Sequence, residues 1–162
     1  MAIAVYPGSF DPVTLGHLDI ARRAAMIFDT VVIAVYDRPQ KNLLFSAQQR
    51  VELIRNSLGD LPTIRVDTYS GLTVHYAASV GAKAIVRGLR AATDFEHEFQ
   101  MAHINHRLVP DIQVVCLMAN QEHTFLSSSA VKEIAALGGP INDMVSPSVE
   151  RALQAVYAER NR

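Results

Sequence analysis

The chain has 162 residues, of which 49% are hydrophobic and 19% charged, and its formal net charge is −1. This length fits one domain with a single core, and near neutrality provides no field that would attract duplex DNA or an acidic membrane surface. No apolar run approaches the roughly 18 residues of a membrane span, and the first residues lack the basic start and long apolar stretch of a signal peptide.

Short β-branched runs alternate with helical patterns along the chain. Runs typical of parallel strands covered on both faces are residues 2–6, 31–36, 63–67, 82–87 and 112–118. Helical spacing and end signals predict helices over 16–28, 46–58, 71–82, 94–109, 127–139 and about 147–160. The alternation predicts the α/β class, as a Rossmann-like, doubly wound, five-stranded parallel sheet in a single domain over residues 1–162.

The only cysteine, Cys116, lies inside the apolar run IQVVCLM. A catalytic thiol is the alternative, but this setting favours a core residue. A lone thiol also fits a reducing compartment. We therefore expect a cytoplasmic protein.

Three strand-to-helix junctions are candidate ligand sites, because open α/β sheets bind ligands beyond the carboxyl ends of their strands. The first has the sequence YPGSFDPVTLGH, over residues 6–17. Gly8 permits close backbone approach, Ser9 offers a hydroxyl, and the N–H groups of the helix that opens at Gly16 and His17 can bind an anion. The alternative is a purely structural role, in which Asp11-Pro12 forms a turn and Thr14 caps the helix.

The second junction spans residues 87–98 and contains two arginines and a glutamate that lies off the polar face of its predicted helix. Arg87 ends an apolar run, and Arg90 follows after two residues, so their guanidinium groups can clamp phosphates. Two solvated surface arginines are the alternative. Glu98 falls off the polar stripe of its predicted helix, which indicates a site or an interface.

The third junction, residues 119–129, ends in three serines at a helix start. Ser127, Ser128 and Ser129 offer hydroxyls together with free N–H groups, which is an arrangement suited to an anion. Serine caps are also common without any ligand.

Together these motifs resemble a known family. GSFDPVTLGH is similar to the signature of the nucleotidyltransferase α/β superfamily, His/Thr-x-Gly-His, here in the threonine form from Thr14 to His17. From the first strand to about residue 139, the chain resembles the bacterial phosphopantetheine adenylyltransferases, including the block RGLR…DFEHEFQMA and the three serines. Position 9 is serine where the family often has threonine, a change that keeps the hydroxyl.

The resemblance implies reversible transfer of AMP from ATP to 4′-phosphopantetheine, giving dephospho-coenzyme A and pyrophosphate. It implies these catalytic residues: His17, Lys41, Ser9 and Arg90. The implied ATP-binding residues are Ser9, Phe10, His17, Gly88, Leu89, Arg90, Glu98, His123, Thr124, Phe125, Leu126, Ser127, Ser128 and Ser129. The implied acceptor-binding residues are Ser9, Lys41, Leu72, Thr73 and Arg87. Arg38 lies close enough to Lys41 to compete for its assignment.

The resemblance also implies a homo-hexamer and feedback inhibition by coenzyme A. Mg²⁺ is expected with ATP, bound mainly through phosphates and water, so we name no protein ligand to a metal. No nucleic-acid or membrane partner is expected.

Two alternatives remain. Nicotinamide mononucleotide adenylyltransferases and cytidylyltransferases share the first signature, but more often carry histidine where Thr14 stands. A non-catalytic nucleotide-binding module would keep the phosphate sites but could lack His17 or Lys41, and both are present. A dehydrogenase is disfavoured because the GxGxxG motif is missing.

Overall fold

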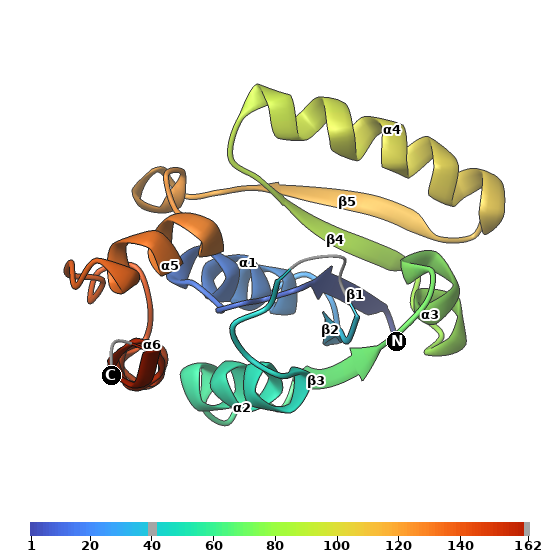
Figure 1. Cartoon of the computed structure of the whole chain (residues 1–162). Helices are drawn as coiled ribbons and strands as arrows, with labels where there is room; N and C mark the ends of the chain where they lie inside the picture. The colour runs from blue at the N-terminus through green and yellow to red at the C-terminus, as the bar shows by residue number, and fades with distance from the viewer. Residues whose placement is uncertain (39–41, 161–162) are drawn as a thin grey trace.

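The computed structural model describes residues 1–38 and 42–160. Within them the chain order of elements is β1 (Ile3–Gly8), α1 (Leu15–Ala25), β2 (Thr30–Tyr36), α2 (Ala47–Leu58), β3 (Ile64–Tyr69), α3 (Thr73–Ser79), β4 (Ala84–Leu89), α4 (Ala92–Leu108), β5 (Gln113–Met118), the 3₁₀ turn η1 (Gln121–His123), α5 (Ser128–Ala136) and α6 (Pro147–Arg160). The expected α/β alternation is confirmed (Figure 1). No helix among these residues has the length and apolar character needed to cross a membrane.

The five strands form one parallel sheet in the order β3-β2-β1-β4-β5. The chain therefore winds outward from β1 in one direction to β3 and then in the other to β5, which confirms the doubly wound sheet. The order reverses between β1 and β4, and the carboxyl ends of these neighbours are the expected ligand site.

Two apolar clusters cover the two faces of the sheet. On one face, Val31, Ile33 and Val35 of β2 join the cluster that includes residues of α1, α2, α5 and α6. On the other, Val32 and Ala34 of the same strand join the cluster that includes residues of α3. The alternation follows from the period of two in a strand, and burial on both faces explains why β2 is continuously apolar from Val31 to Val35.

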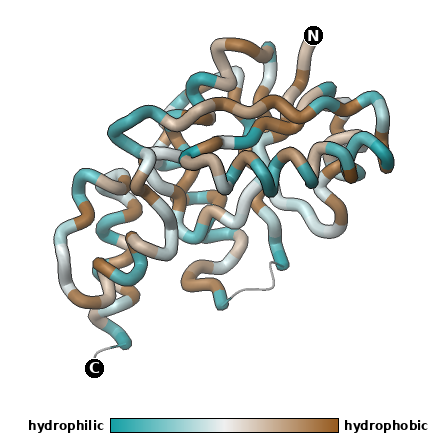
Figure 2. Tube along the Cα trace, turned by 90° about the horizontal axis from the view of Figure 1, so that it is seen from above, coloured by the Kyte–Doolittle hydropathy of each residue, from teal (hydrophilic) through white to brown (hydrophobic). Residues whose placement is uncertain are grey.

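Helix α4 lies over β4 and β5 (Figure 1) and keeps much of its apolar surface exposed. Seen from above, hydrophobic and hydrophilic positions are mixed along it (Figure 2). The exposed large apolar side chains of this helix are Phe95, Phe99, Met101, Ile104 and Leu108. The helix begins at Ala92 rather than at the predicted Asp94, which lies in its first turn and accepts a hydrogen bond from the backbone N–H of Arg90.

The prediction of a buried Cys116 is wrong, because the thiol is exposed. The reason is topological: β5 is an edge strand, and each of its side chains is either partly buried or exposed. The edge strand β3 likewise exposes Arg65 and Asp67, so it is not covered on both faces as expected. A third difference concerns the bounds of β4. The strand begins and ends two residues later than the predicted 82–87, so Arg87 lies inside it and not at its end.

Candidate active site

The loop after β1 adopts a strained conformation at Phe10. Its φ of 49° lies in the left-handed region, which non-glycine residues occupy at a cost and most often at functional sites. The Phe10 ring is buried and folds back over Gly8, where an added Cβ would lie 3.0 Å from ring atoms. A glycine at position 8 therefore avoids a tight contact with this ring, and Gly8 and Ser9 both line the cavity.

Thr14 and His17 form a capping box at the start of α1. The Thr14 hydroxyl accepts from the backbone N–H of His17 at 3.4 Å, and the His17 ring accepts from the backbone N–H of Thr14 at 3.0 Å, through Nδ1. Nδ1 therefore carries no proton, and the proton of the neutral ring is on Nε2. The capping and functional interpretations of this motif are compatible, since capping orients the histidine.

His17 is held in its neutral form. Burial, the largest cause, and the positive charges of Arg90 and Arg87 together lower its pKa to about 4. At neutral pH the ring is consequently an uncharged hydrogen-bond donor, through Nε2–H. This is the form that can stabilise charge developing on a phosphate oxygen without losing its own proton.

Arg87 and Glu98 form an ion pair between β4 and α4. Arg87 Nη2 lies 2.8 Å from Glu98 Oε1, its Nε donates to the same oxygen at 2.9 Å, and its Nη1 donates to the Pro7 carbonyl at 3.2 Å. Glu98 is only 7% exposed, consistent with its place off the polar stripe of the helix. The pair fixes the guanidinium beside the end of β1.

Arg90 and the start of α5 form the opposite wall. Arg90 Nη1 donates to the Leu126 carbonyl at 2.5 Å, which joins the end of β4 to the segment before α5. Ser127 caps α5 by accepting from the N–H of Ala130 at 3.1 Å, and the Ser128 hydroxyl donates to the Pro12 carbonyl at 2.7 Å. Arg90 and the first residues of α5 therefore line the same cavity, where a cationic side chain lies beside a helix N-terminus.

Two cavities meet at the carboxyl end of the sheet. The α5 cavity, about 490 Å³, lies between the loop after β1, the end of β4 and the start of α5. The α3 cavity, about 460 Å³, lies between β1, the start of α3 and the face of α4. Six residues line both: Pro7, Gly8, Ser9, Arg87, His97 and Glu98.

Most sequence-predicted site residues line these cavities. The α5 cavity contacts Ser9, Phe10, His17, Arg87, Gly88, Arg90, Glu98, His123, Leu126, Ser127, Ser128 and Ser129. Leu72 and Thr73 line the α3 cavity. Leu89, Thr124 and Phe125 line neither. Lys41 lies outside the described residues.

The sequence analysis missed His97, Thr93 and Asp94 as cavity residues. His97 also belongs to a stripe with Met101, Ile104 and Leu108, which lines the α3 cavity. The spacing of three and four residues along that stripe was the available signal.

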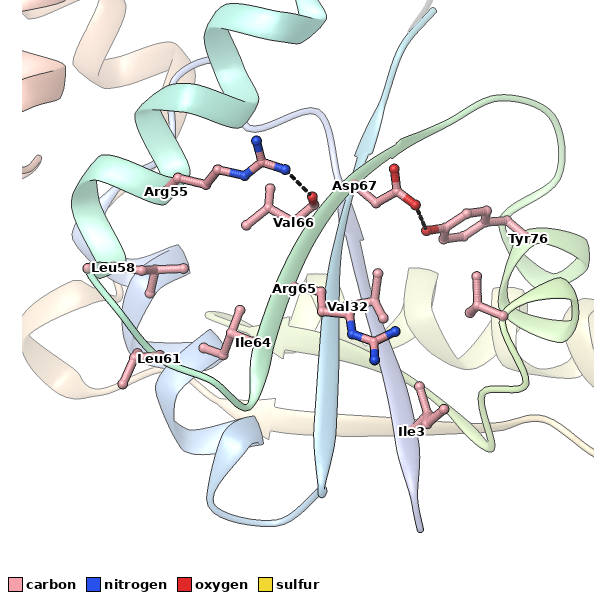
Figure 3. A pocket seen from close by; sticks show the side chains of 12 residues that line it. Ile3, Val32, Arg55, Leu58, Leu61, Ile64, Arg65, Val66, Asp67 and Tyr76 are labelled. Atoms are coloured by element: carbon pink, nitrogen blue, oxygen red, sulfur yellow. Dashed lines mark hydrogen bonds between the residues drawn. The ribbon is translucent and has the colours of Figure 1, made fainter.

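A third cavity lies at the β3 edge and is shown in Figure 3. Three of its polar side chains are hydrogen-bonded: Arg55 donates to the Val66 carbonyl at 3.0 Å, and Tyr76 donates to Asp67 at 3.1 Å. It includes Ile3, at the amino end of β1, and it shares no residue with the α5 or α3 cavities. The chemistry of the first two cavities does not extend to it.

Comparison with known proteins gives consistent matches. Residues 5–134 match the model of the cytidylyltransferase-like family. The chain is 61% identical over 160 residues to phosphopantetheine adenylyltransferase of Roseiflexus castenholzii, covering 99% of this chain and all of that one. This chain belongs to the phosphopantetheine adenylyltransferase family. The protein of that name from Herpetosiphon aurantiacus is 59% identical over 157 residues, with 97% of this chain and 95% of the relative covered.

A solved structure shows the same fold at low sequence identity. The bifunctional NMN adenylyltransferase/ADP ribose pyrophosphatase from Francisella tularensis superposes with a TM-score of 0.73 at 18% identity, over 99% of this chain and 53% of that one. This similarity concerns the fold alone. The family assignment rests instead on the relatives that match 97–99% of this chain, and that family is one of nucleotidyltransferases.

Proposed function

We propose that this chain transfers the adenylyl group of ATP to 4′-phosphopantetheine, releasing pyrophosphate and dephospho-coenzyme A. One observation carries the proposal: two cavities of similar size share a wall of six residues at the switch point of the sheet. A nucleotide in the α5 cavity and a long acceptor in the α3 cavity would bring their phosphates together at this wall. The names of the close relatives support the choice of acceptor.

The acceptor phosphate is the nucleophile in this reaction. One of its oxygens forms a bond to the α-phosphorus of ATP as the bond from that phosphorus to the bridging oxygen breaks, and the electron pair leaves with pyrophosphate. The protein supplies position and charge stabilisation, and no covalent enzyme intermediate is needed.

His17 is proposed to act on the α-phosphate. Its Nε2–H would donate to a non-bridging oxygen, with Nδ1 held by the Thr14 N–H at 3.0 Å. Ser9 and Arg87, together with Lys41, would hold the acceptor phosphate against the charge repulsion of the triphosphate. Arg90 and the serines at the start of α5 would bind the β- and γ-phosphates.

The remaining contacts divide between the two substrates. Leu72 and Thr73 would line the path of the pantetheine arm. The segment that contains His123 and Leu126, with Gly88 and Glu98, would enclose the nucleoside part of ATP.

Mg²⁺ is proposed as the cofactor, bound mainly through ATP phosphates and water. Among residues 1–38 and 42–160, no three histidine, cysteine or acidic side chains gather in a way that could hold a metal ion. When bound it would neutralise triphosphate charge.

Assembly, regulation and location are also proposals. The exposed apolar side chains of α4 support burial in a homo-hexamer. Coenzyme A contains the product's adenylated pantetheine arm, so it is proposed to inhibit by occupying both cavities. We propose a cytoplasmic location, where coenzyme A would be made.

The deciding assay measures pyrophosphate release with ATP and Mg²⁺. Parallel reactions contain 4′-phosphopantetheine, nicotinamide mononucleotide or no acceptor. Release with phosphopantetheine alone is expected. Release with the mononucleotide would show that the proposed acceptor is wrong. ATP binding without release in any reaction would favour a non-catalytic nucleotide-binding module.

A further inference from the structure

A buried carboxylate lies behind the loop that follows β1. Asp11 is 4% exposed, and its two oxygens accept from the N–H groups of Leu44 at 2.9 Å and Phe45 at 3.0 Å. Lys132 of α5 forms an ion pair with it at 2.9 Å. A buried carboxylate is costly unless such partners satisfy it, so the three contacts are strongly favoured. One side chain therefore joins three separate segments of the chain.

Arg50 reinforces the same junction from α2. This fully buried side chain donates through Nη1 to the Ser9 carbonyl at 2.6 Å and to the Tyr36 carbonyl at 2.9 Å. Its Nε donates to the Phe45 carbonyl at 3.2 Å. Charged side chains thus hold both the N–H and the carbonyl of Phe45, and the backbone of Ser9 is tied to the same unit.

Asp11 and Lys132 line neither the α5 cavity nor the α3 cavity. They instead connect the two walls of the α5 cavity, because Asp11 follows Ser9 and Phe10 while Lys132 follows the serines at the start of α5. The bond from the Ser128 hydroxyl to the Pro12 carbonyl, at 2.7 Å, is a second link between the same walls.

We infer that Asp11 is a positioning residue, which acts with Lys132 to set the distance between Ser9 and the serines at the start of α5. This inference rests on the proposed function, in which those two walls hold the acceptor phosphate and the triphosphate. In-line transfer depends on their separation, whereas ATP affinity is spread over contacts from β4, α4 and η1 as well. Loss of Asp11 therefore affects the reaction step more than binding.

The first test is Asp11→Asn, which keeps the size of the side chain but removes its charge and places an amide N–H₂ among donors. We expect kcat to fall about 10²-fold, the scale of a misplacement near 1 Å. The Kd for ATP, measured by calorimetry without acceptor, should change by less than about threefold, because most binding contacts remain. An unchanged kcat contradicts the inference.

Lys132→Met separates positioning from direct contact with ATP. It breaks the ion pair but leaves the two backbone hydrogen bonds of Asp11, so a smaller loss of kcat is expected. The double variant should be no slower than Asp11→Asn alone, because partners in one pair are not additive. Additive losses, or weaker ATP binding by Lys132→Met, would show that the lysine acts on the nucleotide itself.

Asp67→Asn is the matched control. Asp67 also accepts from a backbone N–H, that of Thr68 at 2.8 Å, and from the Tyr76 hydroxyl at 3.1 Å, but on the β3 edge. Its kcat should equal that of the parent chain. All rates are taken per folded molecule, well below the unfolding temperature, so a general loss of stability does not mimic the effect.

Amide hydrogen exchange tests the junction independently of turnover. Asp11→Asn should speed exchange at Leu44 and Phe45 while leaving β1 unchanged, and unchanged exchange at both would overturn the inference. Inactivity of the parent chain would instead reject the proposed function, and the exchange result would still stand. If Asp11→Asn does not fold, Lys132→Met alone decides by its kcat at constant ATP affinity.

Discussion

The Nδ1 atom of His17 accepts a hydrogen bond of 3.0 Å from the backbone N–H of Thr14, so the cap of α1 fixes the tautomer of the histidine. The same contact that begins the helix leaves Nε2–H as the free donor. The same hydrogen bond therefore serves both the helix cap formed with Thr14 and the proposed catalytic function of His17.

Substitution of His17 by alanine should lower kcat by roughly 10²–10³-fold, the usual loss when one transition-state donor is removed. The Kd for ATP should change little, because the donor strengthens its bond only as charge develops. Steady-state kinetics together with calorimetric ATP titration measures the two quantities. Equal losses of turnover and ATP affinity would assign His17 to ground-state binding instead.

The depressed pKa of His17 gives a stability prediction with a definite sign. Unfolding returns the ring from a pKa of about 4 to its ordinary 6.5, so the unfolded chain binds the extra proton between these values. The stability associated with the neutral ring is fully present above pH 6.5 and is lost as the pH falls toward 4. Urea unfolding of the parent chain and of His17→Gln should show a stability difference that varies with pH only in this window. A constant difference would contradict it.

Gly8→Ala should destabilise the chain by about 1–3 kcal/mol, the usual cost of overpacking. The new Cβ would lie 3.0 Å from atoms of the buried Phe10 ring, which must shift. Gly16→Ala is the control, since its Cβ would make only ordinary contacts near 3.5 Å and would favour the helix. Urea denaturation compares the two variants. Equal stabilities would mean that the loop accommodates the methyl group.

Arg87→Met should destabilise the chain by leaving the buried Glu98 carboxylate unpaired. Loss of one partner from a buried pair costs about 3–5 kcal/mol, and partial exposure of Arg87 reduces this to about 2 kcal/mol. The double variant Arg87→Met with Glu98→Leu should recover most of that stability. Its KM for the acceptor should nevertheless remain raised, because the phosphate-binding guanidinium is gone. Recovery of both properties would give Arg87 a purely structural role.

Phe99→Glu tests the proposed assembly through α4. The Phe99 side chain is exposed in the single chain, so its substitution should leave the unfolding temperature of the isolated subunit unchanged. Burial of a carboxylate in an apolar interface is unfavourable, and the mass in sedimentation should fall below that of a hexamer. Glu96→Gln, also an exposed α4 position, should keep the parent mass. If the Phe99→Glu variant still forms a hexamer, the interface does not involve this face of α4.

Local sequence patterns were sufficient to predict the alternation of strands and helices and the positions of the three junctions. Apolar runs such as residues 31–36 are visible in sequence because burial on both faces of a central strand constrains every position. The signature from Thr14 to His17 is equally local, since a capping box requires residues only three apart. The start of the last helix at Pro147 was also predictable, because a proline suits the first turn of a helix.

Only the tertiary structure decided which of these residues meet, and in what state. Cys116 is exposed because its strand lies at an edge, and strand order is not a local property. The neutral charge of His17 arises from burial and from arginines more than 60 residues away in sequence. The partners of Asp11 in the segment 44–45 and in α5 have no local signal at all. Short-range patterns constrain the backbone near each residue, whereas pairing, burial and pKa depend on distant segments that only the folded chain brings together.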